Sequence, residues 1–317
     1  MAWICQYCSN SNDNSAKLCI VCDAKRPESL LDFDLTSQMN AAKRRVSGLG
    51  TISTEANPEQ LYKEACDLVK TNPDLAYKKM CESADKGFVK AALKIGVWYY
   101  YGQVVEKNFE EAITRLTPLA IRGEAEAQYF LALCYQEIEE RKRNYNLAFL
   151  WLTKAADQGH GGAMNSLGHC FYEGRGVAVD LAEALRWYEL AATKKSPWGT
   201  YYAGRMYFNG RGVEKDQKKG FDYFIAASAL GNIKAKGMVG YCYMNGYGTT
   251  RDVNRAIEYL IPAAESGDAT AQYNLALCYE SLSGVSNLRL AAKWYLKAAD
   301  QGYKMASDAV ARLKRYI

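Results

Sequence analysis

The sequence of 317 residues contains only two histidines, and no apolar run in it approaches the length that spans a bilayer, roughly 18–20 residues. The sequence also has no large excess of charge of either sign, because its 40 lysines and arginines are nearly balanced by 35 aspartates and glutamates. Few histidines leave few groups that titrate near neutral pH, and a net charge of +5 gives no strong nucleic-acid footprint. We therefore expect neither a membrane span nor a nucleic-acid partner, and no catalytic centre is visible.

What the sequence does contain is a pattern that returns every 36 residues. A small residue marks each copy, at Ala91, Ala127, Ala163, Gly199, Ala235 and Ala271. An aromatic residue follows eight positions later, at Tyr99, Tyr135, Phe171, Tyr207, Tyr243 and Tyr279. A glycine closes most copies, except that Lys195 replaces it once and Gly302 arrives one residue early. So strict a period indicates an array of structural repeats.

Each copy is predicted to form two helices, most clearly in residues 160–195. Apolar residues recur at helical spacing in residues 163–171 and again in 184–192. Between them, Gly174 and Gly176 predict a turn with positive φ that ends the first helix. The fold class is therefore all-α, and each helix pair must bury its apolar face against its neighbours.

Two further columns of the repeat support this interpretation. Asp180 is predicted to cap the second helix, with Glu183 completing a capping box, and the equivalent place is held by Asn144, Asp216 and Asp252. A second column stays tiny, so that a neighbouring helix can approach closely; it consists of Gly96, Ala132, Gly168, Gly204, Gly240 and Ala276.

This pattern resembles the Sel-one-like repeat family, a relative of the tetratricopeptide repeats, over six units in residues 89–302. The resemblance implies a right-handed α/α superhelical solenoid whose concave face holds partner proteins or peptides, and it implies no catalysis. Residues 58–88 are interpreted as a divergent N-terminal helix pair, residues 303–317 as a C-terminal capping helix, and residues 28–57 as a flexible linker.

The cysteines of the repeats are interpreted as small buried apolar residues. Cys134, Cys170, Cys242 and Cys278 share one column on the core side of the first helix. Some secreted members of the family join the two helices of each unit by a disulfide. Here the second helices from residue 109 onward carry no partner cysteine, which favours reduced thiols and a cytoplasmic setting. The start of the chain also lacks a basic region followed by an apolar core, so no secretory signal is predicted.

Residues 1–27 are interpreted as a separate zinc finger. Two C-x-x-C pairs can place four thiolates around one structural zinc ion, and the ligands are Cys5, Cys8, Cys19 and Cys22. Together with Trp3 and Asn12, these cysteines resemble the Ran-binding-protein zinc finger, also called NZF. So short a segment would derive its folding energy from the metal.

That family has two well-known ligands, ubiquitin and single-stranded RNA, and this sequence departs from both patterns. Ser9 and Asn10 replace the Thr-Phe pair of ubiquitin-binding members, although Val21 keeps the apolar residue before the fourth cysteine. Asp13 replaces the aromatic residue that stacks on RNA bases. We therefore expect neither ubiquitin nor RNA as a tight ligand, and interpret the finger as a protein-binding module.

A stripe of large side chains follows the first helices at positions two, six and nine after the small residue. It includes Tyr129, His169, Tyr172, Tyr201, Arg205, Tyr241 and Tyr273. Tyrosine and arginine are enriched in recognition surfaces, so this stripe is predicted to line the concave, partner-binding groove. The alternative is that these aromatic residues are additional core between helices of adjacent units.

The function predicted from the sequence is that of an adaptor or scaffold with two interaction modules. The groove of the array would bind a partner protein or peptide, and the finger a second partner. One alternative is an RNA- or ubiquitin-associated adaptor that acts through the finger. An enzyme is the third possibility, since catalysis needs converging titratable groups that the sequence does not reveal.

Overall fold

The computed structural model describes residues 3–4, 11–12, 57–140, 143–282 and 284–316. It divides into two compact units, Met1–Trp151 and Leu152–Ile317, and each is described by itself. The described elements are helical apart from one antiparallel pair of two-residue strands, β1 (Trp3–Ile4) and β2 (Ser11–Asn12). The predicted zinc ligands Cys5, Cys8, Cys19 and Cys22 lie outside the described residues, as does almost all of the predicted linker.

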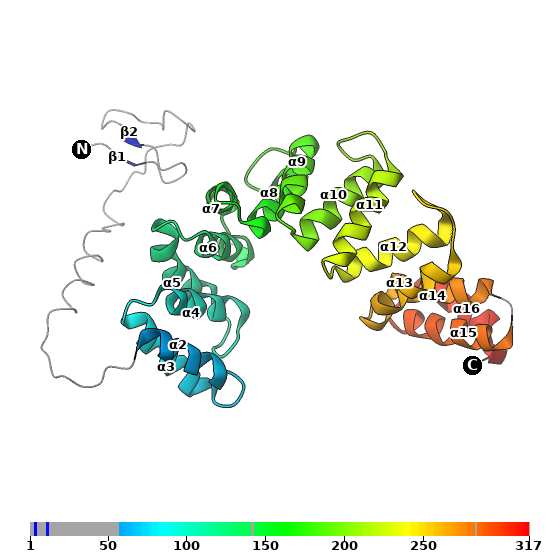
Figure 1. Ribbon diagram of the computed structural model, residues 1–317, viewed down its shortest axis with the longest axis horizontal. Helices are drawn as coiled ribbons and strands as arrows, with labels where there is room; N and C mark the ends of the chain where they lie inside the picture. Colours follow the sequence, from blue (N-terminus) through cyan, green and yellow to red (C-terminus); the bar gives the residue numbers. More distant parts are fainter. Residues whose placement is uncertain (1–2, 5–10, 13–56, 141–142, 283, 317) are drawn as a thin grey trace, which may run out of the picture. The chain divides into compact units, whose positions relative to one another are not determined.

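In the first unit, consecutive helices pack on one another from α2 to α6 (Figure 1). These helices are α2 (Pro58–Leu68), α3 (Pro73–Asp85), α4 (Val89–Tyr101), α5 (Phe109–Ile121) and α6 (Ala125–Glu137), and α7 (Tyr145–Asp157) begins in this unit. Asn57 accepts a hydrogen bond from the backbone N–H of Glu59 and so caps α2, which begins at Pro58.

The second unit by itself shows the same kind of packing, each helix packing on the next from α8 to α16 (Figure 1). Its helices are α8 (Gly161–Glu173), α9 (Leu181–Thr193), α10 (Pro197–Asn209), α11 (Gln217–Ala229), α12 (Ile233–Asn245), α13 (Val253–Glu265), α14 (Ala269–Ser281), α15 (Val285–Asp300) and α16 (Lys304–Arg312), and a 3₁₀ turn, η2 (Lys314–Tyr316), follows. The even-numbered helices from α8 to α14 are the first helices of their repeats.

The turn between the two helices of a repeat has the predicted left-handed residues. Gly174 and Gly176 have φ of 73° and 75°, and the corresponding glycines after α10 and α12 match them. In the first repeat Val104 takes the second of these places at φ 66°, and Lys195 closes its repeat at φ 55° where other repeats have glycine. A side chain in this conformation costs free energy, and packing of the repeat supplies it.

The predicted cap of the second helix is present, but the prediction of a capping box is wrong. Asp180 accepts a hydrogen bond from the backbone N–H of Glu183 at 3.0 Å. The Asp180 N–H, however, donates to the carbonyl of Phe171 at 2.9 Å, and the Glu183 carboxylate binds Arg186 instead. The same N–H to carbonyl bond recurs in four other repeats, from Asn108, Asn144, Asp216 and Asp252. In these five repeats it ties the cap of the second helix to the aromatic column of the first.

The tiny column packs against the second helix of its own repeat. A Cβ added at Gly168 would lie 2.5 Å from the Tyr188 ring, and one at Gly240 would lie 2.5 Å from Leu260. The small residue that marks the start of each copy, position zero of the repeat, instead faces the preceding repeat. A Cβ on Gly199, which holds this position in α10, would lie 2.3 Å from Ala191. Each first helix is therefore held between two second helices, which leaves one side for the surface.

The repeat cysteines are buried, as the sequence predicted. Cys134, Cys170, Cys242 and Cys278 are all buried. Burial in apolar surroundings disfavours the thiolate and raises the pKa of Cys242 to about 12. These residues therefore act as core.

Candidate functional site

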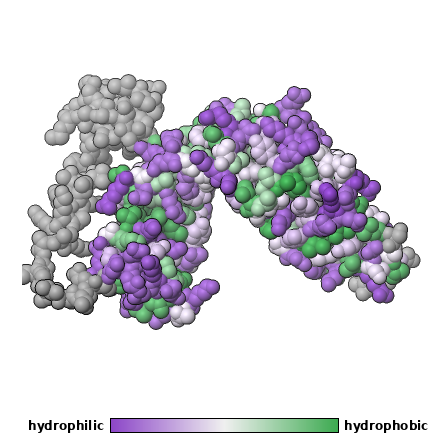
Figure 2. Space-filling view, viewed as in Figure 1, coloured by the Kyte–Doolittle hydropathy of each residue, from purple (hydrophilic) through white to green (hydrophobic). Residues whose placement is uncertain are grey.

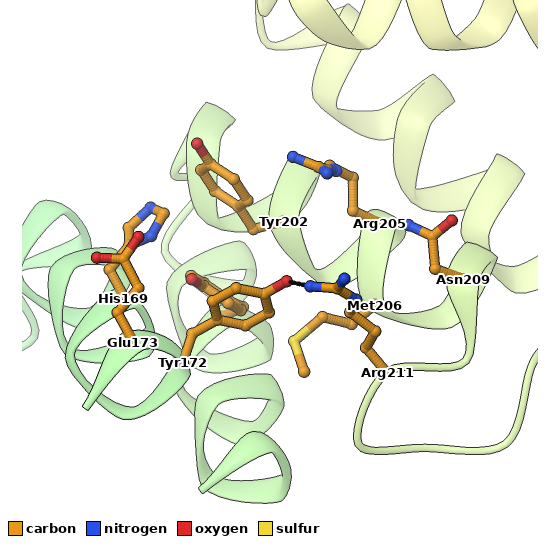
Figure 3. A pocket seen from close by; sticks show the side chains of 9 residues that line it. His169, Tyr172, Glu173, Tyr202, Arg205, Met206, Asn209 and Arg211 are labelled. Carbon is orange, nitrogen blue, oxygen red and sulfur yellow. Dashed lines mark hydrogen bonds between the residues drawn. The ribbon is translucent and has the colours of Figure 1, made fainter. Parts of the chain in front are cut away.

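Two adjoining hollows lie on the first-helix side of the second unit, and together they are called the groove. The smaller hollow, of about 240 Å³, is lined by α8, α9, α10 and the loop after α10 (Figure 3). The larger, of about 810 Å³, is lined by α10, α12, α14 and Tyr303. Tyr202, Arg205 and Asn209 line both hollows, so α10 forms the ridge between them.

The groove face of α10 follows directly from helical geometry. Trp198, Tyr202, Arg205 and Asn209 are spaced by four, three and four residues, so their side chains project from one side of the helix. Ser196 caps this helix by accepting a hydrogen bond from the backbone N–H of Gly199 at 3.3 Å. The chain therefore enters α10 immediately before Trp198, which places this large ring at the end of the groove face.

The rings of the groove contact one another and form a continuous aromatic surface. Tyr202 stacks on Tyr188, at 5.3 Å between centroids, and on Trp198, at 6.1 Å, and the His169 ring meets it in a T-shaped contact at 4.3 Å between centroids. Trp198 nevertheless remains 47% exposed. An exposed tryptophan held by neighbouring rings is a preformed contact surface, because little side-chain entropy is left to lose on binding.

Two guanidinium groups of the groove have aromatic partners rather than carboxylates. Arg211 donates a hydrogen bond to the Tyr172 hydroxyl and lies 5.6 Å from that ring's centroid (Figure 3). Arg205 lies 5.9 Å from the ring of Tyr201. Within the described part of the chain, neither has a carboxylate at ion-pair distance. A tyrosine ring orients a guanidinium without neutralising its charge.

The remaining charges of the groove are already paired. The Glu173 carboxylate binds Arg175 at 2.7 Å. Lys234 pairs with Asp268, which also caps α14 by accepting from the backbone N–H of Ala271 at 2.8 Å. Burial acts to raise the pKa of Asp268, but the Lys234 ammonium and the cap N–H outweigh it and lower that pKa. The groove consequently keeps a net positive character around Arg205 and Arg211.

The two histidines have different places. His169 lines the smaller hollow, and burial lowers its pKa, which favours the neutral imidazole. His160 caps α8, its Nδ1 accepting a hydrogen bond from the backbone N–H of Ala163 at 3.1 Å. Among the described residues, no three histidine, cysteine or acidic side chains converge in a way that would hold a metal ion.

The structure gathers most of the predicted stripe in this place. His169, Tyr172, Tyr201, Arg205 and Tyr241 all line one or both hollows. Tyr201 is only 8% exposed and packs against Phe224, so for this residue the alternative interpretation as core fits better.

The two other predicted residues lie elsewhere. Tyr129 belongs to the first unit and contacts Phe130. Tyr273 packs on Tyr295 and Tyr303 at the end of the second unit, outside both hollows.

Sequence reasoning missed Trp198, Tyr202 and Asn209. These residues stand at positions minus one, three and ten of the repeat, whereas the predicted stripe used positions two, six and nine. Phe208, at position nine, is 8% exposed and thus largely core. Successive residues of a helix are separated by about 100° of rotation. The exposed face of α10 is rotated from the predicted face by somewhat more than half of this step. Trp198 was the sequence feature that could have revealed this face, because it places an indole ring at an otherwise polar helix start.

The surface of the second unit visible in Figure 2 mixes hydrophilic residues with hydrophobic patches. None of the helices in the described part combines the length and the apolarity that crossing a bilayer requires.

Comparison with solved structures supports the repeat architecture. The chain is similar to c5321, a protective antigen of uropathogenic Escherichia coli with an SLR fold, at 24% identity and a TM-score of 0.70, covering 87% of this chain and 59% of that one. It is also similar to a Sel1 repeat protein from Oxalobacter formigenes, at 26% identity and a TM-score of 0.65, covering 81% and 76%. The chain thus spans less than two thirds of the length of c5321.

A more distant likeness is to the immunity protein PA5088 of Pseudomonas aeruginosa, at 19% identity and a TM-score of 0.50, covering 71% of this chain and 85% of that one. No curated protein matches the chain significantly. The profile of the Sel1 repeat matches residues 89–114, 125–160, 162–196, 199–232, 234–268 and 269–303. These six stretches cover well over half of the sequence, and the chain therefore belongs to the Sel1 repeat family.

Proposed function

We propose that this protein is an interaction adaptor whose groove holds a segment of a partner protein. Sel1 repeat proteins are generally protein-interaction scaffolds. The observation that carries the proposal is that Trp198 is half exposed, stacks on Tyr202 and lines the same hollow as Arg205. Tryptophan, tyrosine and arginine are the residues in which binding energy concentrates at interfaces, especially when neighbouring rings fix them in place.

Site-specific photocrosslinking in the full chain tests this proposal. A photoreactive amino acid replaces Trp198 in one variant, and in a matched control it replaces Asp222, an exposed residue of α11 outside both hollows. The proposal expects a partner protein to be crosslinked from position 198 and not from position 222. Equal crosslinking from both positions, or none from 198 while the partner is still retained, would contradict it.

We propose further that residues 1–27 form a second module around one structural zinc ion held by Cys5, Cys8, Cys19 and Cys22. The cysteine spacing supports this, since four thiolates suit a closed tetrahedral site. The strand register adds support, because Trp3 and Asn12, the two other residues of the finger pattern, are partners across β1 and β2.

Metal analysis tests the zinc proposal. The freshly purified chain should contain one zinc ion per molecule, and Cys19→Ser should lose it. The melting of the helical repeats should be unchanged in that variant, because their core lies elsewhere. A chain that purifies without zinc, or a variant that retains it fully, would refute the site.

A further inference from the structure

The charges and the two hollows of the groove specify the partner more closely. Building on the proposed function, we infer that the groove binds an extended acidic peptide in which an aspartate or glutamate stands next to a large apolar or aromatic residue. The carboxylate would lie between Arg205 and Arg211, and the apolar side chain would enter the larger hollow.

Charge complementarity argues for the carboxylate. Elsewhere in the second unit, Arg186, Arg255 and Arg312 each have a carboxylate within ion-pair distance. Arg205 and Arg211 instead have tyrosine rings, which hold the guanidinium planes and leave N–H groups for another acceptor. A planar guanidinium matches a carboxylate in shape as well as in charge. The anion that would complete these two groups is thus absent from the protein's own described residues.

A cationic side chain is the rival occupant, because three tyrosines and Glu173 around the smaller hollow resemble a cage for an ammonium group. Two observations exclude this alternative. The Glu173 carboxylate already binds Arg175 at 2.7 Å. An incoming cation would also approach two guanidinium groups that no carboxylate neutralises, and like charges at such distances repel.

The larger hollow argues for a peptide with an apolar neighbour to the acidic residue. It adjoins the smaller hollow at Arg205 and is lined by Trp198, Met238 and Tyr241. Successive residues of an extended chain advance about 3.3 Å each, so a segment that crosses the α10 ridge can place neighbouring side chains on its two sides.

Two amide groups can serve the backbone of such a peptide. Asn209 and Asn274 both line the larger hollow. A carboxamide offers both a donor and an acceptor, as does each peptide unit. An extended segment is therefore better suited to this surface than an isolated small acid.

The test uses a library of random ten-residue peptides displayed on phage. The library is selected against the full chain and, in parallel, against its Trp198→Ala variant. The most enriched peptide is then synthesised and titrated by fluorescence anisotropy against the full chain and against Arg205→Gln, Arg211→Gln and Arg255→Gln. Arg255 is the matched control, because it also lies 5.6 Å from a tyrosine ring, that of Tyr243, but on a second helix. Circular dichroism confirms that each variant folds.

We expect peptides that depend on Trp198 to carry an acidic residue beside an aromatic or large aliphatic one. Arg205→Gln and Arg211→Gln should each weaken the synthesised peptide about tenfold, and Arg255→Gln less than about twofold. Trp198-dependent peptides that are neutral or basic, or that bind both groove variants as tightly as the control, would overturn the acidic assignment while leaving the proposed function intact. If no selected peptide depends on Trp198, the proposed function fails as well.

Discussion

The first-helix side and the second-helix side of the Leu152–Ile317 unit satisfy their charges differently. On the second helices, acidic and basic side chains pair with one another, as in Arg186 with Glu183 at 2.8 Å and Lys218 with Asp222 at 2.6 Å. On the first-helix side Lys234 pairs with Asp268, but Arg205 and Arg211 lie over tyrosine rings and have no ion-pair partner among the described residues. Exposed ion pairs contribute little to stability, so the difference concerns what each surface can still bind.

Glu189 shows how the second-helix side uses polar groups to join neighbouring helices. Its carboxylate accepts hydrogen bonds from the hydroxyls of Tyr207 at 2.8 Å and Tyr223 at 3.1 Å, and Lys219 lies 3.6 Å away. The two tyrosine rings stack at 5.8 Å between centroids. This cluster joins α9, α10 and α11. Substitutions on this side should therefore change stability, and those on the groove side should change binding.

The largest expected effect is at Tyr201, which lies at the boundary between the two roles. Because Tyr201 is 8% exposed and packs against Phe224, Tyr201→Ala should lower the free energy of unfolding by about 3 kcal/mol. Urea denaturation followed by circular dichroism measures this loss. Tyr241→Ala, at a half-buried groove position, is the control and should cost clearly less. If the Tyr201→Ala variant is as stable as the parent, Tyr201 is not part of the core and is better interpreted as a residue of the groove surface.

A smaller loss is expected when the second-helix cluster is cut at Glu189. Glu189→Ala should lower the free energy of unfolding by about 1–2 kcal/mol, because two partly buried hydroxyls lose their acceptor. Glu183→Ala serves as the control, since its exposed pair with Arg186 should contribute less than about 0.5 kcal/mol. Equal losses in the two variants would show that the Glu189 cluster has no special structural role.

The smallest effect has the opposite sign. Lys195 holds φ at 55°, where other repeats have glycine, so Lys195→Gly should raise the free energy of unfolding by about 0.5–1 kcal/mol. Lys194→Gly, at φ −87°, should give no such gain. Thermal melts of the two variants measure the difference. A destabilised Lys195→Gly protein would mean that the lysine side chain contributes contacts which outweigh its backbone strain.

Much of the fold could be predicted from the sequence because several repeats carry the same local signals. Gly174 and Gly176 indicate the left-handed turn, and Asp180 indicates the cap. Val104 shows the limit, since a β-branched residue at φ 66° contradicts local preference and only the surrounding repeat imposes that conformation. The absence of the capping box could not be predicted either. The Asp180 N–H donates to the carbonyl of Phe171 in the preceding helix and is therefore not available to the Glu183 carboxylate.

The groove could be predicted only in part. The sequence identified the first helices and several correct residues, among them His169, Tyr172 and Arg205. It did not fix which side of α10 stays exposed, because that depends on how α10 packs between α9 and α11. This packing buries Tyr201 and Phe208 and exposes Trp198. The sequence of a single helix shows the spacing of its apolar residues, but it does not show how the helix is rotated about its axis when it packs against its neighbours.

The most direct test of the account is a paired measurement on Trp198→Ala and Glu189→Ala, recording melting temperature and the affinity for a groove-selected peptide in the same preparations. Trp198→Ala should melt close to the parent and bind about tenfold more weakly. Glu189→Ala should melt lower and, below its transition, bind as the parent does. If Trp198→Ala keeps its affinity, or if Glu189→Ala loses affinity to the same extent while folded, the division between a binding side and a structural side is wrong.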